Sequence, residues 1–286
     1  MKVIKTSIRI YNNKTIRSIW DENTKLWYYA AVDLISILTN SKNPKTYWPV
    51  FKKRHPQIIT NCKQLKLRAF DGKMYVTDVL NENGIDELLF LLPSRNNENI
   101  KKWIKGLSDP IDEKSKQKAY ELYDSGLLKD IEVGTTKGLQ QIHAYIFGGL
   151  YDFAGKIRSK TISKDNFMFC DAKYLNQELK RIELMSQSTI EEIVDKYIDM
   201  NIAHPFMEGN GRSTRIWLDQ ILKKELKKCV DWSKIEKKNY LDAMRKSPTN
   251  SKPILKLIKS SLTAKINNRE IFMKGIDYSY YYEEIE

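Results

Sequence analysis

The sequence predicts an α+β domain in residues 1–106, followed by a largely helical domain in residues 116–286 that contains one small β-hairpin. Three observations support this division. The polar segment Leu107–Ser115 contains a proline and three acids, so we expect a linker there. In the first part, an Asp-Gly pair between two short alternating segments is typical of a β-hairpin. In the second part, apolar residues recur at helical spacing over long stretches.

Within residues 1–106, alternation of polar and apolar residues predicts strands, and apolar spacing predicts one short helix. Val79–Leu92 ends in an apolar run that fits either a buried helix or a buried strand, and the sequence leaves both open. A weak break is expected at Ser41–Pro44. The predicted strands are Ser7–Ile10, Leu65–Phe70 and Lys73–Thr77, the last two joined by Asp71-Gly72, and the predicted helix is Tyr28–Leu38.

Within residues 116–286, the clearest helix follows a capping box, in which Thr189 precedes Glu192 by three residues. The apolar residues from Ile190 to Ile202 then recur at helical spacing. Glycine and proline in His204–Arg212 prevent that segment from being helical throughout. The other predicted elements are helices at Lys114–Tyr123, Lys137–Phe153 and around Ile216–Leu222, a hairpin at Ile162–Phe169, and a break at Ser247–Pro253.

Composition and charge exclude several classes of protein. The chain has 286 residues and a net charge of +13, and residues 1–70 contribute 14 basic against 3 acidic side chains. Such a basic patch attracts phosphate backbones or simply keeps a surface solvated. The three cysteines lack metal-binding spacing, and their odd number argues against a disulfide framework. No secretory signal and no apolar run of about 18 residues is found, so we expect a cytoplasmic protein that does not span a membrane.

The segment His204–Arg215, HPFMEGNGRSTR, combines the groups that phosphoryl or nucleotidyl transfer needs. Gly209, Asn210 and Gly211 can bring backbone N–H groups close to a phosphate where a helix begins. Arg212 and Arg215 lie three residues apart, and each guanidinium suits phosphate oxygens. Glu208 offers a hard oxygen ligand for Mg²⁺, and His204 can take a proton near neutral pH. Each residue alone has an ordinary structural explanation, but the set within twelve residues favours a site.

The same segment resembles the Fic motif, HPFx(D/E)GNGRxxR, at every specified position. Glu132–Arg158 is similar to the helices that precede the motif in that family, and the resemblance extends over about Lys114–Glu286. It implies an all-α Fic domain with a small β-hairpin flap. Most members of the family transfer AMP from ATP to a Tyr, Ser or Thr hydroxyl of a target protein, so the resemblance implies an adenylyltransferase that uses ATP and Mg²⁺.

The resemblance also implies a role for each matching residue. His204 would be the general base, Phe206 would pack the loop into the core, and Glu208 would hold Mg²⁺. Gly209, Asn210 and Gly211 would cradle phosphates, and Arg212 and Arg215 would bind the β and γ phosphates. The flap would be Ile162–Phe169, with Lys164 near the nucleotide, and it would clamp the target by strand pairing. Tyr240 and Met244 are candidates for the adenine pocket or are ordinary residues of a C-terminal helix.

Many Fic proteins carry an inhibitory helix with the pattern (S/T)xxxE(G/N), whose glutamate pairs with the second motif arginine. Ser279 and Glu283 match this pattern, but Glu284 stands where the family has Gly or Asn. We expect Glu283 to pair with Arg215 and to withhold that arginine from ATP. A second segment, Ser94–Asn99, fits the pattern literally with Glu98 as its acid, but it lies in the other domain.

Residues 1–106 resemble the Bro-N domain of viral Bro proteins and phage antirepressors, which is usually taken to bind DNA. The segments that carry this looser resemblance are Trp27–Leu38, Tyr47–Arg54, Asp71–Leu92 and Ile100–Trp103. A target-docking module is the rival interpretation. The basic residues expected to line a DNA phosphate face are Lys52, Lys53, Arg54, Lys63, Lys66 and Arg68.

Three functions compete at this stage. The first is an AMP-transferring enzyme with a DNA-binding or targeting appendage; bacterial Fic proteins of this kind act as toxins or regulators, with type II topoisomerases among their targets. The second is a transcriptional regulator whose Fic part only senses nucleotide. The third is transfer of another phosphate-containing group, which the motif alone does not exclude. An oligomer is compatible with all three.

Overall fold

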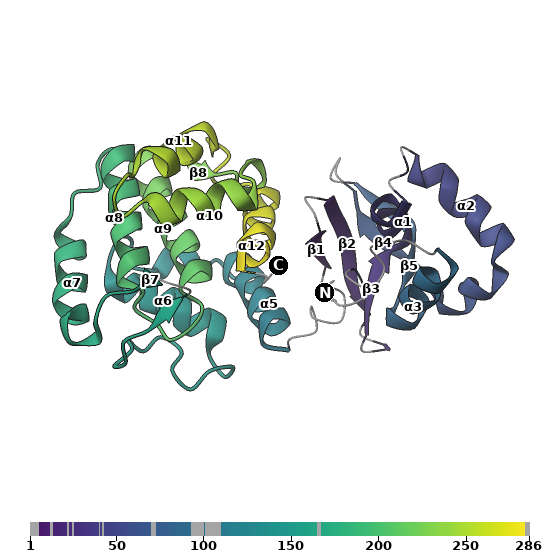
Figure 1. The fold of residues 1–286 in the computed structure, drawn as a ribbon, viewed down its shortest axis with the longest axis horizontal. Coiled ribbons are helices and arrows are strands. Elements are labelled where there is room, and N and C mark those ends of the chain that lie inside the picture. The colour runs from purple at the N-terminus through teal and green to yellow at the C-terminus, as the bar shows by residue number, and fades with distance from the viewer. Residues whose placement is uncertain are drawn as a thin grey trace. The chain divides into compact units, whose positions relative to one another are not determined.

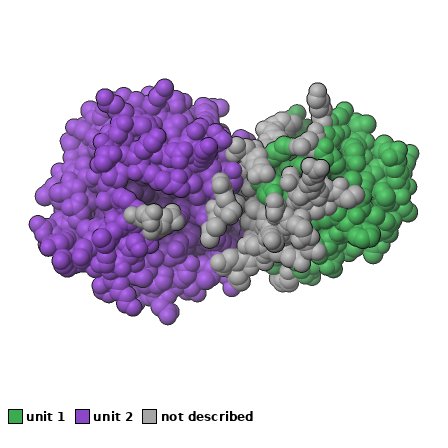
Figure 2. All heavy atoms as spheres, viewed as in Figure 1, with its two compact units in different colours: residues 1–110 green, residues 111–286 purple. Residues whose placement is uncertain are grey.

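The chain forms two compact units, residues 1–110 and 111–286, in a computed structural model (Figure 2). The structure describes residues 6–11, 14–21, 23–24, 26–39, 41, 43–69, 73–92, 100, 110–164 and 167–283, without the side chains of residues 6–10, 68 and 110. The predicted turn Asp71-Gly72, the segment Ser94–Asn99 and Glu284 lie outside the described residues. Within the described part, no helix is both long and apolar enough to cross a bilayer.

Unit 1 is an antiparallel five-stranded sheet packed against helices, with strand order β1-β2-β3-β5-β4. Its core gathers apolar side chains of α1, α2 and α3 on the sheet, with Leu34, Ile35 and Leu88 fully enclosed. The elements are β1 (Thr6–Tyr11), β2 (Lys14–Asp21), β3 (Leu26–Ala30), α1 (Ala31–Thr39), α2 (Pro44–Arg54), the 3-10 helix η1 (Pro56–Asn61), β4 (Cys62–Arg68), β5 (Met74–Leu80) and α3 (Glu82–Leu91) (Figure 1).

Unit 1 contains both strands and helices, but several elements differ from the prediction. The predicted helix Tyr28–Leu38 is wrong over its first turn, because Tyr28–Ala30 belong to β3 and the helix begins at Ala31. Aromatic residues favour strands, and the pairing of β3 with both β2 and β5 outweighs the helical spacing there. Strand β2 and helix α2 were not predicted, and Val79–Leu92, left open between helix and strand, ends β5 and then forms α3. The predicted hairpin is confirmed, since β4 and β5 pair from Cys62↔Leu80 to Arg68↔Met74.

Unit 2 is largely helical, as predicted, and its helix α9 lies at the centre, packed against α6, α8 and α12 (Figure 1). Trp217, Leu218 and Ile221 of α9 are fully buried. The helices are α5 (Pro110–Asp124), α6 (Thr136–Phe147), α7 (Ala172–Leu184), α8 (Ile190–Ala203), α9 (Asn210–Leu226), α10 (Lys237–Lys246), α11 (Lys252–Ser260) and α12 (Arg269–Glu283). Short 3-10 helices lie at η2 (Leu127–Asp130) and η3 (Trp232–Lys234).

Two small antiparallel strand pairs complete unit 2. The predicted hairpin Ile162–Phe169 is confirmed as β6 (Ser163–Lys164) paired with β7 (Phe167–Met168). The pair β8 (Cys229–Val230) and β9 (Leu262–Thr263) was not predicted, because its two short strands lie far apart in the sequence and no local turn signal joins them.

Helix boundaries in unit 2 follow local chemistry. The capping box of Thr189 and Glu192 is confirmed at the start of α8. The predicted helix Lys137–Phe153 is too long, because α6 ends at Phe147 before Gly148 and Gly149, and Gly149 has a φ of 74°. Helix α5 begins at Pro110, earlier than the predicted Lys114, so residues 110–115 of the expected linker are helical.

Candidate functional site

The candidate site lies in the loop His204–Gly209, between the end of α8 and the start of α9. His204 follows the last residue of α8 in the left-handed conformation, with φ 49° and ψ 63°. Gly209 precedes α9 with φ 77°, a conformation that side chains disfavour, and a Cβ there would lie 2.3 Å from the Phe147 ring. Both ends of the loop are therefore fixed by residues in the left-handed conformation, His204 after α8 and Gly209 before α9.

The imidazole of His204 is held in its neutral form. Its Nδ1 lies 3.1 Å from the carbonyl oxygen of Asn201. Since a carbonyl only accepts, Nδ1 must carry the hydrogen, which leaves Nε2 with a lone pair. Burial lowers the pKa of His204 to about 4, so the ring is uncharged at neutral pH. The Phe169 ring stacks on it with centroids 3.7 Å apart.

The start of α9 has no side-chain cap, so its backbone N–H groups suit an anion. The first N–H groups of a helix have no intrahelical acceptor, and Gly209 offers no capping side chain. The Asn210 side chain is occupied elsewhere: its Oδ1 accepts from Phe206 N at 2.8 Å and its Nδ2 donates to Phe206 O at 2.8 Å. Asn210 thus braces the loop, and only backbone N–H groups remain for phosphate. Phe206 is fully buried, as predicted.

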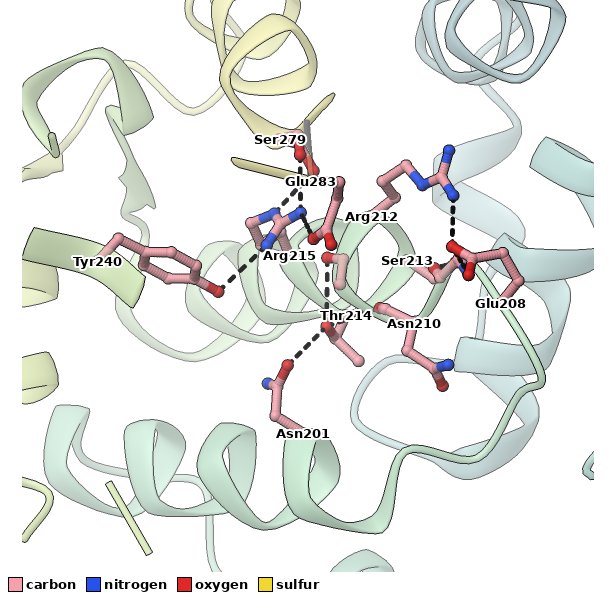
Figure 3. A network of polar contacts seen from close by, with 12 residues as sticks. Asn201, Glu208, Asn210, Arg212, Ser213, Thr214, Arg215, Tyr240, Ser279 and Glu283 are labelled. Carbon is pink, nitrogen blue, oxygen red and sulfur yellow. Dashed lines mark hydrogen bonds and ion pairs between the residues drawn. The ribbon is translucent and has the colours of Figure 1, made fainter. Parts of the chain in front are cut away.

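Arg215 is engaged by α12. Its side chain is 3% exposed. The guanidinium donates to Ser279 Oγ at 2.7 Å, Ser279 O at 2.8 Å and Glu283 Oε1 at 2.6 Å. Figure 3 shows Ser279 and Glu283 approaching Arg215 from α12, with Tyr240 on its other side. Burial works to raise the pKa of Glu283, but the charge of Arg215 outweighs it and holds that pKa below its ordinary value.

The Glu283 carboxylate also covers the start of α9. A Cβ added at Gly211 would lie 2.2 Å from Glu283 Oε1, so this oxygen sits directly against the glycine. A phosphate that approaches the Gly211 backbone would meet the same oxygen. The carboxylate therefore fills the space directly beside the Gly211 backbone.

Arg212 is engaged by two other carboxylates. Its Nη2 donates to Glu208 Oε1 at 2.8 Å, and its Nη1 forms an ion pair with Asp112 of α5. Phe147 and Tyr280 place their rings 5.0 and 5.1 Å from the guanidinium carbon. Arg212 Nε is buried and has no hydrogen-bond partner among the described residues.

Glu208 suits a magnesium ion that is shared with phosphates. Its side chain is 55% exposed, and Oε1 accepts from Gly209 N at 2.9 Å and from Arg212. The described residues contain no cluster of three or more His, Cys, Asp or Glu that could hold a metal. One carboxylate is nevertheless sufficient for Mg²⁺ where nucleotide phosphates and waters supply the other oxygens, so Glu208 fits that role.

The flap contributes Lys164, whose Nζ lies 3.8 Å from Glu283 Oε2 and whose side chain is 67% exposed. The predicted adenine residues lie deeper. Tyr240 is 3% exposed, hydrogen-bonds Tyr197 OH at 2.6 Å, accepts from Arg215 at 3.2 Å and stacks on Tyr282. Met244 packs against the core of unit 2. These contacts agree with the core interpretation, and a role of either residue in adenine binding stays a prediction.

Four residues near the site were not singled out from the sequence. His143 Nδ1 accepts from Gly155 N at 2.9 Å, so its Nε2 donates to Glu208 O at 2.8 Å and holds the loop. Asn201 orients His204, Asp112 pairs with Arg212, and Arg158 donates to main-chain carbonyls around His204. A signal existed for Asn201 alone, which lies three residues before His204 on α8.

The basic residues predicted to face DNA lie in unit 1, and two of them have acidic partners. Lys52 pairs with Asp78, and Lys63 pairs with Asp21 at 2.8 Å. Lys53, Arg54 and Lys66 are exposed. The Arg68 side chain lies outside the described residues. DNA binding by unit 1 stays a prediction.

Comparison with known proteins places the site in context. Residues 134–222 match the model of the Fic/DOC family. The chain is 30% identical over 145 residues to protein adenylyltransferase VbhT of Bartonella schoenbuchensis, which covers 46% of this chain and 30% of that protein. It is 30% identical to the probable protein adenylyltransferase y4lH of Sinorhizobium fredii over 37% of this chain and 61% of that protein. The chain thus spans less than two thirds of these relatives.

Similar relatives and solved structures extend the comparison. The probable protein adenylyltransferase Fic of Escherichia coli is 25% identical over 46% of this chain and 71% of its own length. The structure of BepC from Bartonella tribocorum with bound AMPPNP has a TM-score of 0.47 and 19% identity, over 56% of this chain and 87% of that chain.

Proposed function

We propose that unit 2 is a protein adenylyltransferase, which transfers AMP from ATP to a Tyr, Ser or Thr hydroxyl of a protein substrate. The observation that carries the proposal is the neutral His204, with a free Nε2, beside a helix N-terminus and two arginines within residues 204–215. The match of residues 134–222 to the Fic/DOC family and the relatives named protein adenylyltransferase support it.

The chemistry follows from these groups. His204 Nε2 accepts the proton of the target hydroxyl, whose oxygen attacks the α-phosphorus of ATP. A new oxygen–phosphorus bond forms, the bond between the α-phosphorus and the bridging oxygen breaks, and pyrophosphate leaves. The α9 N-terminus, Arg212 and Arg215 hold the phosphates that depart. Magnesium bound at Glu208 would neutralise part of their charge.

Labelled nucleotide tests this proposal. Wild type, Glu283→Gly and His204→Ala are incubated with ATP labelled at the α or at the γ position, together with bacterial lysate. We expect protein label from the α position only, strongest with Glu283→Gly and absent with His204→Ala. Label from the γ position would mean kinase chemistry instead, and ATP binding without any label would support the nucleotide-sensor alternative.

We further propose that the structure is the autoinhibited state of this enzyme. Glu283 occupies Arg215 and the space over Gly211, while Asp112 occupies Arg212. A triphosphate needs both arginines, so activity requires that α12 leave this position. Release of α12 is then a shift between two populations, and any partner that favours the released state activates the enzyme.

A buried ion pair holds the inhibitory helix against α5. Asp277 of α12 pairs with Lys116 Nζ at 2.8 Å, and their side chains are 3% and 5% exposed. Asp277 also accepts from Tyr120 OH, and Tyr280 OH donates to Ser115 Oγ at 2.8 Å. We therefore expect this contact to determine how readily α12 is released.

Asp277→Asn should both favour release of α12 and lower the stability of unit 2. Removing one partner of a buried pair costs roughly 3–5 kcal/mol, because the other charge stays buried. Thermal unfolding should shift downward, and AMP transfer should rise above wild type. The matched control is Asp124→Asn, which breaks the exposed α5–α12 pair with Arg269 at 2.8 Å and should cost no more than about 1 kcal/mol. Equal effects of the two variants on stability and AMP transfer would contradict the role proposed for the Asp277–Lys116 pair.

A further inference from the structure

Arg158 is a buried guanidinium that binds main-chain carbonyls around the candidate base. It lies between α6 and the flap and is 5% exposed. Its Nε donates to His204 O at 2.7 Å, and its Nη2 donates to Ala203 O at 3.0 Å and Cys170 O at 2.5 Å. Its Nη1 donates to Lys160 O at 2.6 Å. Among the described residues no carboxylate lies within ion-pair distance of this guanidinium.

The four acceptors belong to two structures that must be aligned. Ala203 and His204 end α8, where unpaired carbonyls carry partial negative charge that favours a cation. Lys160 and Cys170 flank the flap strands β6 and β7 on either side. A single planar group therefore ties both ends of the flap to the backbone of His204.

This tie matters because His204 is in a conformation that is costly for a residue with a side chain. Its left-handed backbone is sustained only if the surroundings determine it. The Arg158 bond fixes the His204 carbonyl, the Asn201 carbonyl fixes Nδ1, and Phe169, the last residue of the flap, stacks on the ring. Arg158 therefore contacts the backbone of His204 and also the backbone of Cys170, which follows Phe169.

We propose that Arg158 is a positioning residue, which sets the His204 imidazole in register with the flap and so with the target hydroxyl that the flap presents. The inference rests on the proposed adenylyl transfer. Lysine cannot replace Arg158, because one ammonium has no planar fork to reach four carbonyls in different directions. Arg158 contacts neither Arg212 nor Arg215, so its loss should leave the nucleotide site in place.

The test compares Arg158→Lys and Arg158→Gln in the Glu283→Gly background, with the exposed Arg245→Lys as control. AMP transfer should fall about 100-fold, as expected for a displacement of about 1 Å, because the base no longer faces the hydroxyl. ATP affinity, measured by calorimetry, should stay at the background value. Arg245→Lys should change neither quantity, because Arg245 lies on the surface of α10.

A second readout does not depend on activity. The chain has three histidines, so ¹⁵N-histidine NMR resolves His204, and His204→Asn assigns its signal. Arg158→Lys keeps the positive charge that itself lowers the pKa of His204, so in this variant a rise of that pKa from about 4 towards its ordinary value, with mixed tautomers, would report a displaced ring. These changes in the ring would show that Arg158 positions His204 even if the background variant transfers no AMP. The absence of transfer would contradict only the proposed function.

Two results would overturn the inference. Unchanged pKa and tautomer of His204 in both Arg158 variants would show that the ring is positioned without the guanidinium. A loss of ATP affinity as large as the loss of transfer, with a lower unfolding temperature, would show general damage to unit 2 instead of misplacement of the base.

Discussion

Glu283→Gly is expected to raise AMP transfer about 5- to 150-fold, the range of a coupling free energy of 1–3 kcal/mol between two sites. The substitution removes the carboxylate that pairs with Arg215 at 2.6 Å and covers Gly211. Because Glu283 is the last described residue of α12, glycine there shortens the helix little. The measurement is the rate of α-label incorporation at saturating ATP and magnesium.

The same variant should show a change in stability that depends on nucleotide. Without ATP, the Arg215 charge stays buried and loses its carboxylate, so the unfolding temperature should fall. With ATP and magnesium, the triphosphate supplies the missing anion, so the nucleotide-induced shift should exceed that of wild type. This pattern separates release of the nucleotide site from a general loosening of α12.

Glu270→Gly is the matched control for Glu283→Gly. Glu270 lies in the first turn of the same helix and pairs with Lys274 at 3.1 Å, and among the described residues no ion pair joins it to the motif. It should leave AMP transfer unchanged. If Glu283→Gly gives neither faster transfer nor a larger ATP-induced shift, the Arg215–Glu283 pair is only a structural contact.

Much of this site was accessible from the sequence, because its parts are close along the chain. The motif sets a helix end, a glycine start and two arginines on one helical face within twelve residues, and the structure has that order. The pair of Glu283 with Arg215 followed from a family pattern, and the two side chains meet in the structure. The substitution of Glu284 for Gly or Asn did not prevent this contact.

The supporting residues were hidden for a physical reason. The hydrogen bonds of Arg158, Asn201 and His143 at the site each join a side chain to a main-chain carbonyl. No complementary side chain in the sequence therefore marks the partner. The Asp112–Arg212 pair joins residues 100 positions apart, and a lone aspartate resembles any solvated charge. Local spacing does not encode such contacts.

The fold shows the same limit. The helix α8 was predicted in full because its capping box and apolar face are local signals. Strand β2 and the start of β3 were missed, because their state is decided by pairing with each other and with β5. The end of α6 was overestimated because its apolar spacing continues past Gly148, where only the backbone conformation ends the helix.

Removal of the base is the second large effect. In the Glu283→Gly background, His204→Ala should lower AMP transfer about 10²- to 10⁴-fold, the usual contribution of general base catalysis. ATP affinity should stay at the background value, because the phosphates are held by the α9 N-terminus, Arg212 and Arg215. The control is His55→Ala in unit 1, which should leave transfer unchanged.

His204→Asn separates the base from the backbone it stands on. His204 has φ 49°, which alanine tolerates poorly and asparagine tolerates well. Loss of transfer in both variants, with normal unfolding temperature for asparagine, would assign the effect to the proton acceptor. Transfer retained by asparagine would instead assign it to backbone strain, because an amide cannot accept the hydroxyl proton at neutral pH.

The pH dependence follows from the environment of the ring. Burial lowers the pKa of His204 to about 4, and the base acts in its neutral form. The neutral fraction is therefore complete well above that value and falls only as acid protonates Nε2. Transfer by Glu283→Gly should be independent of pH from about 6 to 8 and decline toward 4. A decline centred near the ordinary histidine pKa would mean that the ring is exposed when α12 is released, because burial is what lowers it.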